Sequence, residues 1–251
     1  MPTSATFAER YRRMRSRWNE DWWSITLGGP LGNVLNGLIA DLPWVKPNRI
    51  TWLSFLCLLA SGPLLLLGSR GADVAAVVLL QLHTILDCMD GSLARYRKAS
   101  SVMGAFLDKV TDMIGLLVVM ACFGWRVWVD TGDAFALLVA TLIAGSIVLR
   151  GYVFWVVASL ERERKVQKPT VGDRRRDCST MSFGERAALY VRSQWKIVEF
   201  AESDLYFWLG LGVALGRMRQ TVYFLGVATG FWAAVILGWR YWTVRKLEAA
   251  R

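Results

Sequence analysis

The stretch from Leu86 to Gly115, LDCMDGSLARYRKASSVMGAFLDKVTDMIG, sets four acidic residues within an otherwise strongly apolar chain. These residues are Asp87, Asp90, Asp108 and Asp112. Within each half of the stretch the aspartates lie three or four residues apart, so on a helix each pair shares one face. A short polar connector, 96–101, separates the halves. Two helices joined there can bring all four carboxylates together.

Four carboxylates gathered at membrane depth would repel one another strongly. Divalent metal would neutralise them, and hard oxygen ligands favour Mg²⁺, Mn²⁺ or Ca²⁺. A purely structural role is disfavoured, because acids inside a membrane are costly and are usually functional. The sequence therefore predicts a metal site made of these four aspartates.

The composition predicts one compact, all-α integral membrane domain. The chain has 251 residues, of which 54% are hydrophobic and 13 are tryptophan. The net charge is +10, and the basic residues gather beside apolar runs. This pattern indicates anionic lipid headgroups or phosphate substrates as partners, and not nucleic acid. The four cysteines stand alone, without the spacing of a metal site.

Hydropathy predicts six transmembrane helices, each long enough to cross a hydrocarbon core that needs about 20 helical residues. They are expected at about 47–67, 73–98, 103–127, 134–160, 197–215 and 222–244. Before them, residues 5–27 mix arginine with aromatic side chains, which predicts an amphipathic helix in the membrane interface; a solvated arm is the alternative. Residues 28–43 are apolar but interrupted by glycine and proline, which predicts a short interfacial or re-entrant helix. The chain thus divides into an N-terminal interfacial segment, 1–46, and a membrane domain, 47–251.

The basic residues also predict the orientation. One side of the membrane receives the N-terminal arginines, Arg95, Arg97, Lys98, the arginines of the polar 161–196 segment, Arg245 and Lys246. The other side receives only Arg70, Arg126, Arg217 and Arg219. The positive-inside rule therefore puts both termini and the aspartates in the cytoplasm. The 161–186 part is expected to be a solvated loop with some helix, or alternatively a gate for an acceptor.

The spacing D-x2-D-G-x2-A-R-x8-G-x3-D-x3-D resembles the signature of the CDP-alcohol phosphotransferase family, which are integral membrane enzymes of phospholipid synthesis. Its eight fixed positions are Asp87, Asp90, Gly91, Ala94, Arg95, Gly104, Asp108 and Asp112. The resemblance implies transfer of a substituted phosphate from a CDP-alcohol, most naturally CDP-diacylglycerol, to an acceptor alcohol with release of CMP. It also implies two Mg²⁺ or Mn²⁺ ions, an active site at the cytoplasmic ends of the second and third helices, and a homodimer in the cell membrane.

The resemblance further assigns roles to individual residues. Asp87, Asp90 and Asp108 would bind metal, while Asp112 would complete the cluster and act as the general base. Contacts to the CDP-alcohol would come from Gly91, Ala94, Arg95, Gly104, Asn48, Thr51 and Ser101. Small residues allow close approach of a nucleotide to the backbone, and the guanidinium fork suits phosphate oxygens. For the small residues, plain helix packing is the alternative.

Other polar residues within the predicted spans are candidates for binding the acceptor. Arg150 is expected either to hold a phosphate on the acceptor or to pair with Glu199 or Glu202 and join two helices. Lys109 lies beside Asp108, and His83 lies one turn before Asp87, where packing is its simpler role.

Two rival functions remain open at this point. The same chemistry could use a CDP-linked polar headgroup as donor and a lipid or sugar phosphate as acceptor. In a different class, a cation or proton transporter would place such acids near the membrane midplane and at repeat interfaces. The sequence shows no internal repeat, which favours the enzyme.

Overall fold

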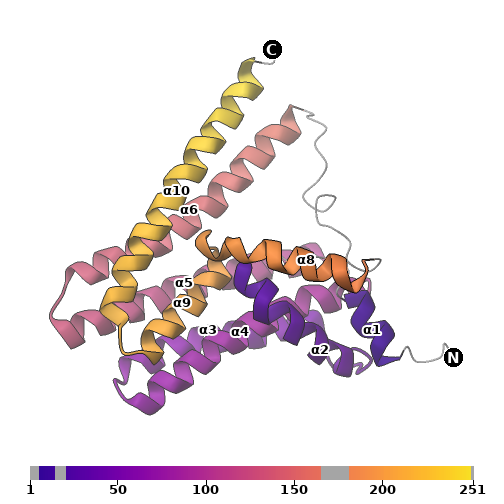
Figure 1. Ribbon diagram of the computed structural model, residues 1–251, viewed down its shortest axis with the longest axis horizontal. Coiled ribbons are helices and arrows are strands. Elements are labelled where there is room, and N and C mark those ends of the chain that lie inside the picture. The colour runs from indigo at the N-terminus through magenta and orange to yellow at the C-terminus, as the bar shows by residue number, and fades with distance from the viewer. Residues whose placement is uncertain (1–5, 15–20, 165–180, 250–251) are drawn as a thin grey trace.

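The computed structural model describes residues 6–14, 21–164 and 181–249, and every regular element within them is helical (Figure 1). The helices are α1 (Phe7–Met14), α2 (Gly29–Ile39), α3 (Pro47–Leu66), α4 (Arg70–Tyr96), α5 (Val102–Thr131), α6 (Phe135–Glu163), α8 (Phe183–Ser193), α9 (Glu202–Ala214) and α10 (Met218–Ala249). A π-helical segment, η1 (Ser24–Gly28), precedes α2, and a 3₁₀ segment, η2 (Gln194–Val198), precedes α9. The predicted all-α class is confirmed.

Four helices, α3, α4, α6 and α10, are long and apolar enough to cross a membrane. This supports a multi-pass membrane protein but covers only four of the six predicted spans. Helix α5 has 30 residues and is not among the four. Helix α9 has 13 residues and is about 20 Å long, against a hydrocarbon core of roughly 30 Å. It begins later than the predicted residue 197 because Phe200, with φ +48°, turns the chain just before it.

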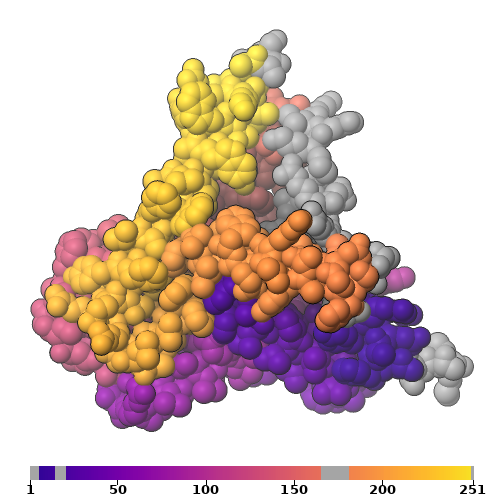
Figure 2. Space-filling model, viewed as in Figure 1, coloured from indigo at the N-terminus to yellow at the C-terminus, as the bar shows by residue number. Residues whose placement is uncertain are grey.

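The described residues of the N-terminal segment form short helices. Helix α1 lies within the predicted 5–27 helix, whereas residues 15–20 of that prediction lie outside the described residues. Helix α2, with 11 residues, is too short to span and packs on α4. α1, α2 and α8 gather at one side of the bundle, and Figure 2 shows α8 lying over the N-terminal helices.

The polar segment after α6 lies only partly within the described residues, since residues 165–180 fall outside them. Beyond this gap α8 begins with a capping box, in which Ser182 and Glu185 bond reciprocally. The backbone N–H and hydroxyl of Ser182 hold the pKa of Glu185 below its usual value. The predicted partial helix is therefore present in this segment.

Local signals fix the ends of the two helices that carry the aspartates. The hydroxyl of Ser69 accepts from the N–H of Ala72 at the start of α4, and that of Ser101 accepts from the N–H of Gly104 at the start of α5. Such N-caps satisfy backbone donors that have no partner within the helix. The connector between α4 and α5 is consequently short, and the two halves of the signature lie at the same end of the bundle.

The core that holds this geometry is built by α3, α4, α5, α6, α9 and α10. Leu58, Leu116, Phe123 and Ile143 are fully buried there. Helices α3 and α5 approach closely at Gly115, where a Cβ atom would lie 2.2 Å from Cδ2 of Leu58. Helices α6 and α10 run side by side, and their C-terminal halves project together away from the other helices (Figure 1).

Substitution of Gly115 with alanine is expected to lower the free energy of unfolding by about 1–3 kcal/mol, because the added methyl forces Leu58 out of its packed position. The matched control is Gly145→Ala in α6, where a Cβ meets nothing within 4 Å. Thermal unfolding of the two variants in the same detergent checks the prediction. Equal melting temperatures would show that the α3–α5 contact is not tight.

Candidate active site

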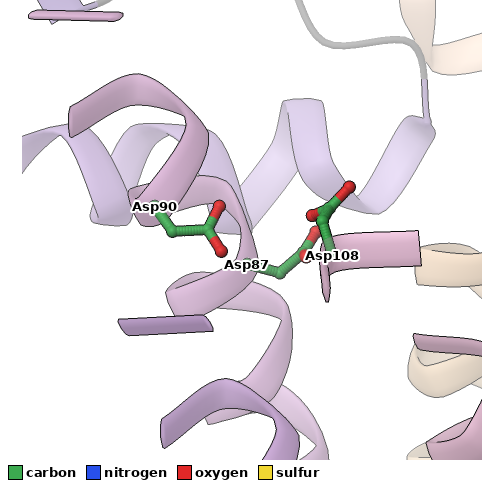
Figure 3. Close-up of side chains that lie close together, drawn as sticks. All are labelled: Asp87, Asp90 and Asp108. Atoms are coloured by element: carbon green, nitrogen blue, oxygen red, sulfur yellow. The ribbon is translucent and has the colours of Figure 1, made fainter. Parts of the chain in front are cut away.

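Three of the predicted metal ligands converge at the ends of α4 and α5. Asp87 and Asp90 come from α4 and Asp108 from α5, and their ligand oxygens all lie within 4.8 Å of one another. Figure 3 shows the three carboxylates turned towards a shared space. Two residues on one helix face and one on the neighbouring helix thus form a single cluster, as the spacing predicts.

The donor set fits a hard divalent cation. Asp90 is only 6% exposed, and its Oδ2 accepts a 2.5 Å hydrogen bond from the hydroxyl of Thr51 on α3. The Nζ of Lys109 lies 3.0 Å from Oδ2 of Asp108. One ammonium leaves most of the charge of three close carboxylates uncompensated. Oxygen-rich, negatively charged sites of this kind suit Mg²⁺ or Mn²⁺.

The fourth aspartate, Asp112, lies one turn beyond Asp108 on α5 and is not among the three residues whose ligand oxygens all lie within 4.8 Å of one another. It is 6% exposed, and its Oδ2 lies 3.5 Å from Nζ of Lys109. Lys109 therefore lies between the carboxylates of Asp108 and Asp112.

A cavity of about 210 Å³ opens beside the cluster. Asp90 and Asp108 form part of its wall. Its lining also contains every residue that the resemblance assigned to the CDP-alcohol: Asn48, Thr51, Gly91, Ala94, Arg95, Ser101 and Gly104. Asp112 is not in the lining. The cavity is therefore bounded by two of the three clustered carboxylates, while the general-base candidate does not line it.

Small residues and tight turns shape this cavity. A Cβ at Gly91 would lie 3.1 Å from Nη1 of Arg95, so the guanidinium folds back over the glycine. A Cβ at Gly104 would lie 3.3 Å from Oδ1 of Asn48. Lys98, at φ +54°, ends α4 in the left-handed conformation that usually takes glycine. The chain thereby reverses quickly enough for α5 to return beside α4.

One residue important for the site was missed by the sequence analysis. The guanidinium of Arg97 donates to the carbonyls of Ala40, Leu42 and Val45. It ties the end of α4 to the loop that leads into α3, and hence to the Asn48 side of the cavity. The sequence analysis used Arg97 only as a positive charge, because nothing in the local pattern shows which carbonyls it meets.

The two candidates for acceptor binding have protein partners. Nη1 of Arg150 donates to the carbonyl of Phe200 at 2.8 Å, and Nη2 donates to that of Glu199 at 3.4 Å. Arg150 thus joins α6 to the turn before α9, through backbone oxygens instead of the carboxylates considered from sequence. Lys109 bridges Asp108 and Asp112.

His83 is buried one turn from Asp87 and is occupied by packing. Its Nδ1 lies 2.8 Å from Oγ of Ser54, and its ring meets the ring of Tyr206 edge-on at 5.1 Å. Packing, the role expected from sequence, therefore agrees with its surroundings.

Comparison with known proteins gives the same family as the signature. Residues 44–232 match the CDP-alcohol phosphatidyltransferase family. The CDP-diacylglycerol–glycerol-3-phosphate 3-phosphatidyltransferases of Shigella flexneri serotype 5b (strain 8401) and Shigella boydii serotype 4 (strain Sb227) are each 26% identical over 179 residues, covering 70% of this chain and 79% of the relative. With the aspartate cluster, the adjoining cavity and a match over most of its length, the chain belongs to the CDP-alcohol phosphatidyltransferase family of membrane transferases.

Proposed function

We propose that this protein transfers the phosphatidyl group of CDP-diacylglycerol to the hydroxyl of an acceptor alcohol and releases CMP. The observation that carries the proposal is the meeting of three buried or half-buried carboxylates with a cavity lined by all seven residues expected to contact the donor. The names of the Shigella relatives support CDP-diacylglycerol as donor.

The carboxylates of Asp87, Asp90 and Asp108 would hold the divalent ions, two in number, with Asp112 completing the cluster. Bound Mg²⁺ or Mn²⁺ would neutralise the diphosphate and make its phosphorus more electrophilic. Thr51 keeps the Asp90 carboxylate oriented towards the cluster through its hydrogen bond. Arg95, folded over Gly91 in the cavity wall, offers planar donors to the phosphate of the CMP portion.

Asp112 is the residue proposed to accept the proton of the acceptor hydroxyl. As that oxygen forms its bond to the lipid-linked phosphorus, the bond to the bridging oxygen breaks and CMP departs. Asp112 is buried on α5 one turn from Asp108 and does not line the cavity proposed for the donor. Lys109, in contact with Asp108 and Asp112, holds both carboxylates in place.

The proposal includes a topology. The active site and both termini lie in the cytoplasm, where nucleotide-linked substrates and Mg²⁺ are available. The basic residues at that end of the helices support this orientation. Helix α5 crosses the membrane with α3, α4, α6 and α10, α9 enters as a shorter sixth segment, and two copies form a homodimer as in the family.

The test is release of CMP by purified protein supplied with Mg²⁺ or Mn²⁺, CDP-diacylglycerol and a panel of alcohols, with lipid products identified by mass. We expect CMP and a new lipid in equal amounts, and loss of both when EDTA is added in excess. CMP release that does not depend on any acceptor would indicate a hydrolase. Cation flux into proteoliposomes without any CMP would support the transporter instead.

A further inference from the structure

The α3 side of the cavity is distant in the sequence from its α4 and α5 side. The α3 side consists of Pro47, Asn48 and Thr51, all within the first five residues of that helix. Much of the other side is formed by the last two turns of α4 and the connector to α5, between Asp90 and Ser101. A nucleotide bound in the cavity contacts both sides only if their separation is fixed, since a misplacement of about 1 Å can cost roughly a hundredfold in rate.

The first turn of α3 has no side chain that caps it. Its N-cap residue is Lys46, whose side chain makes no capping hydrogen bond. Helices α4 and α5, by contrast, begin at the serine caps Ser69 and Ser101. The place of the first turn of α3 therefore depends on the loop 40–46 that leads into it.

The loop 40–46 is bound by the guanidinium of Arg97, which belongs to the α4 side of the cavity. Nε and Nη2 donate to the carbonyl of Ala40 at 3.0 and 2.7 Å, Nη2 donates to that of Leu42 at 2.8 Å, and Nη1 donates to that of Val45. Ala40 and Val45 are 2% and 6% exposed, so water would replace a lost donor there poorly. One planar group with several fixed donors thus holds both ends of the loop.

The backbone around Arg97 is itself fixed by the turn that ends α4. The N–H of Lys98 donates to the carbonyl of Arg95 at 3.1 Å. The N–H of Ala99 donates to that of Ala94 at 2.8 Å. With Lys98 in the left-handed region at φ +54°, these bonds form a Schellman motif. Since Ala94, Arg95 and Ala99 all line the cavity, Arg97 is mounted on a fixed part of the α4 side.

Arg97 is close to the cavity without lining it. All hydrogen bonds of its guanidinium with the described residues go to backbone carbonyls, and the residue is absent from the lining. The signature also leaves its position open, because Arg97 lies in the eight-residue gap between Arg95 and Gly104. Any effect of Arg97 on a bound nucleotide must therefore pass through the loop that it holds.

We propose that Arg97 is a positioning residue for the nucleotide end of the CDP-alcohol, because it sets the separation of the α3 and α4 sides of the cavity. The inference rests on the proposed function, since it concerns the donor site of the same reaction. Arg97 acts through Pro47 and Asn48 in the first turn of α3. Thr51, one turn further along, is held separately by its bond to Asp90, so the metal site should not depend on Arg97.

Arg97→Met tests this role, because it keeps much of the length of the side chain and removes every donor. We expect the KM of CDP-diacylglycerol in mixed micelles, and the calorimetric dissociation constant of CMP with Mn²⁺ present, each to rise at least about tenfold. The affinity for Mn²⁺ alone and kcat at saturating donor should change less than about twofold. A merely structural loss would instead reduce the fraction of active protein, which lowers kcat at an unchanged KM.

Arg97→Lys keeps the proposal testable if the methionine variant folds poorly. The ammonium retains the positive charge but lacks the planar fork, so we expect a KM for the donor about threefold above that of the parent. A KM equal to that of the parent would mean that positive charge near the diphosphate is sufficient, and would overturn the positioning role.

The matched control is Arg49→Met. The exposed side chain of Arg49 donates to the carbonyl of Trp44 in the same loop at 2.9 Å. Loss of this single outer bond should leave the KM of the donor and the affinity for CMP unchanged. Amide hydrogen exchange gives a readout independent of turnover: exchange within 40–50 should be faster in Arg97→Met than in the parent, while exchange within α5 stays the same.

The outcomes separate this inference from the proposed function. A parent protein that binds CMP but makes no lipid would overturn the transferase, while the CMP dissociation constants of the variants decide the role of Arg97. An unchanged KM and CMP affinity in Arg97→Met, or an equal loss in Arg49→Met, would overturn the positioning role while CMP release upholds the transferase. A parent protein that binds no CMP would overturn both.

Discussion

Replacement of Asp112 with asparagine is expected to lower the rate of CMP release at least about a hundredfold, the usual contribution of a general base. The amide cannot take the proton from the acceptor hydroxyl, but it keeps the size of the carboxylate in a position that is 6% exposed. Because Asp112 is not one of the three mutually close carboxylates and does not line the cavity, binding of Mn²⁺ and of CDP-diacylglycerol should change much less than turnover. Single-turnover CMP release, together with calorimetric titration of both ligands, measures the two effects separately.

Asp130→Asn provides the matched control for this experiment. Asp130 is on the same helix, and its Oδ2 accepts from Nε of Arg126 at 2.5 Å, far along α5 from the cluster. Its loss should leave the turnover intact. Near-normal turnover by Asp112→Asn would mean that a different group takes the proton. Loss of Mn²⁺ binding together with loss of turnover would mean that Asp112 acts mainly as a metal ligand.

Replacement of Asp90 with asparagine should weaken Mn²⁺ binding and turnover together, each by more than about a hundredfold. Loss of a partner that orients a metal ligand costs 10–100-fold, and loss of the ligand itself should cost more. Thr51→Val, which removes the hydrogen bond to Oδ2 of Asp90, is expected to fall within that smaller range. Electron paramagnetic resonance of free Mn²⁺ during titration gives the affinity, and CMP release gives the turnover.

The control for Asp90 is Asp41→Asn, which removes a carboxylate that pairs with Arg10 outside the cluster. Asp41→Asn should alter neither the affinity for Mn²⁺ nor the turnover. An Asp90→Asn protein that binds Mn²⁺ as tightly as the parent would refute the assignment of Asp90 as a ligand. A larger effect from Thr51→Val than from Asp90→Asn would show that the hydroxyl matters to the nucleotide more than to the metal.

Sequence predicted the cluster because its determinants are local. Asp87 and Asp90 share a helix face by their spacing alone, and Ser101 caps α5 soon enough to return Asp108 to the same end. The apolar runs likewise predicted α3, α4, α6 and α10 at close to their observed bounds. For these features, the residue spacing, the helix caps and the apolar runs of each local segment were sufficient.

Contacts between distant segments were not predictable in this way. The guanidinium of Arg97 donates to three backbone carbonyls more than fifty residues earlier in the chain. That of Arg150 donates to a carbonyl about fifty residues later in the chain. The left-handed turn at Phe200, which shortens α9, has no glycine to mark it. From sequence Glu202 was a polar residue at the start of the fifth predicted span and a possible partner for Arg150, whereas in the structure its Oε1 accepts from the hydroxyl of Tyr206.

The segment that precedes the family match is held against the membrane helices by hydrogen bonds. The family match begins at residue 44, yet the indole N–H of Trp23 donates to Gln81 on α4, its backbone N–H donates to Asp204 on α9, and Ser24 bonds Ser203. The N-terminal segment is thus hydrogen-bonded both to α4 and to α9. Substitutions in this segment can therefore shift the position of α9 while every residue of the metal-binding signature stays unchanged.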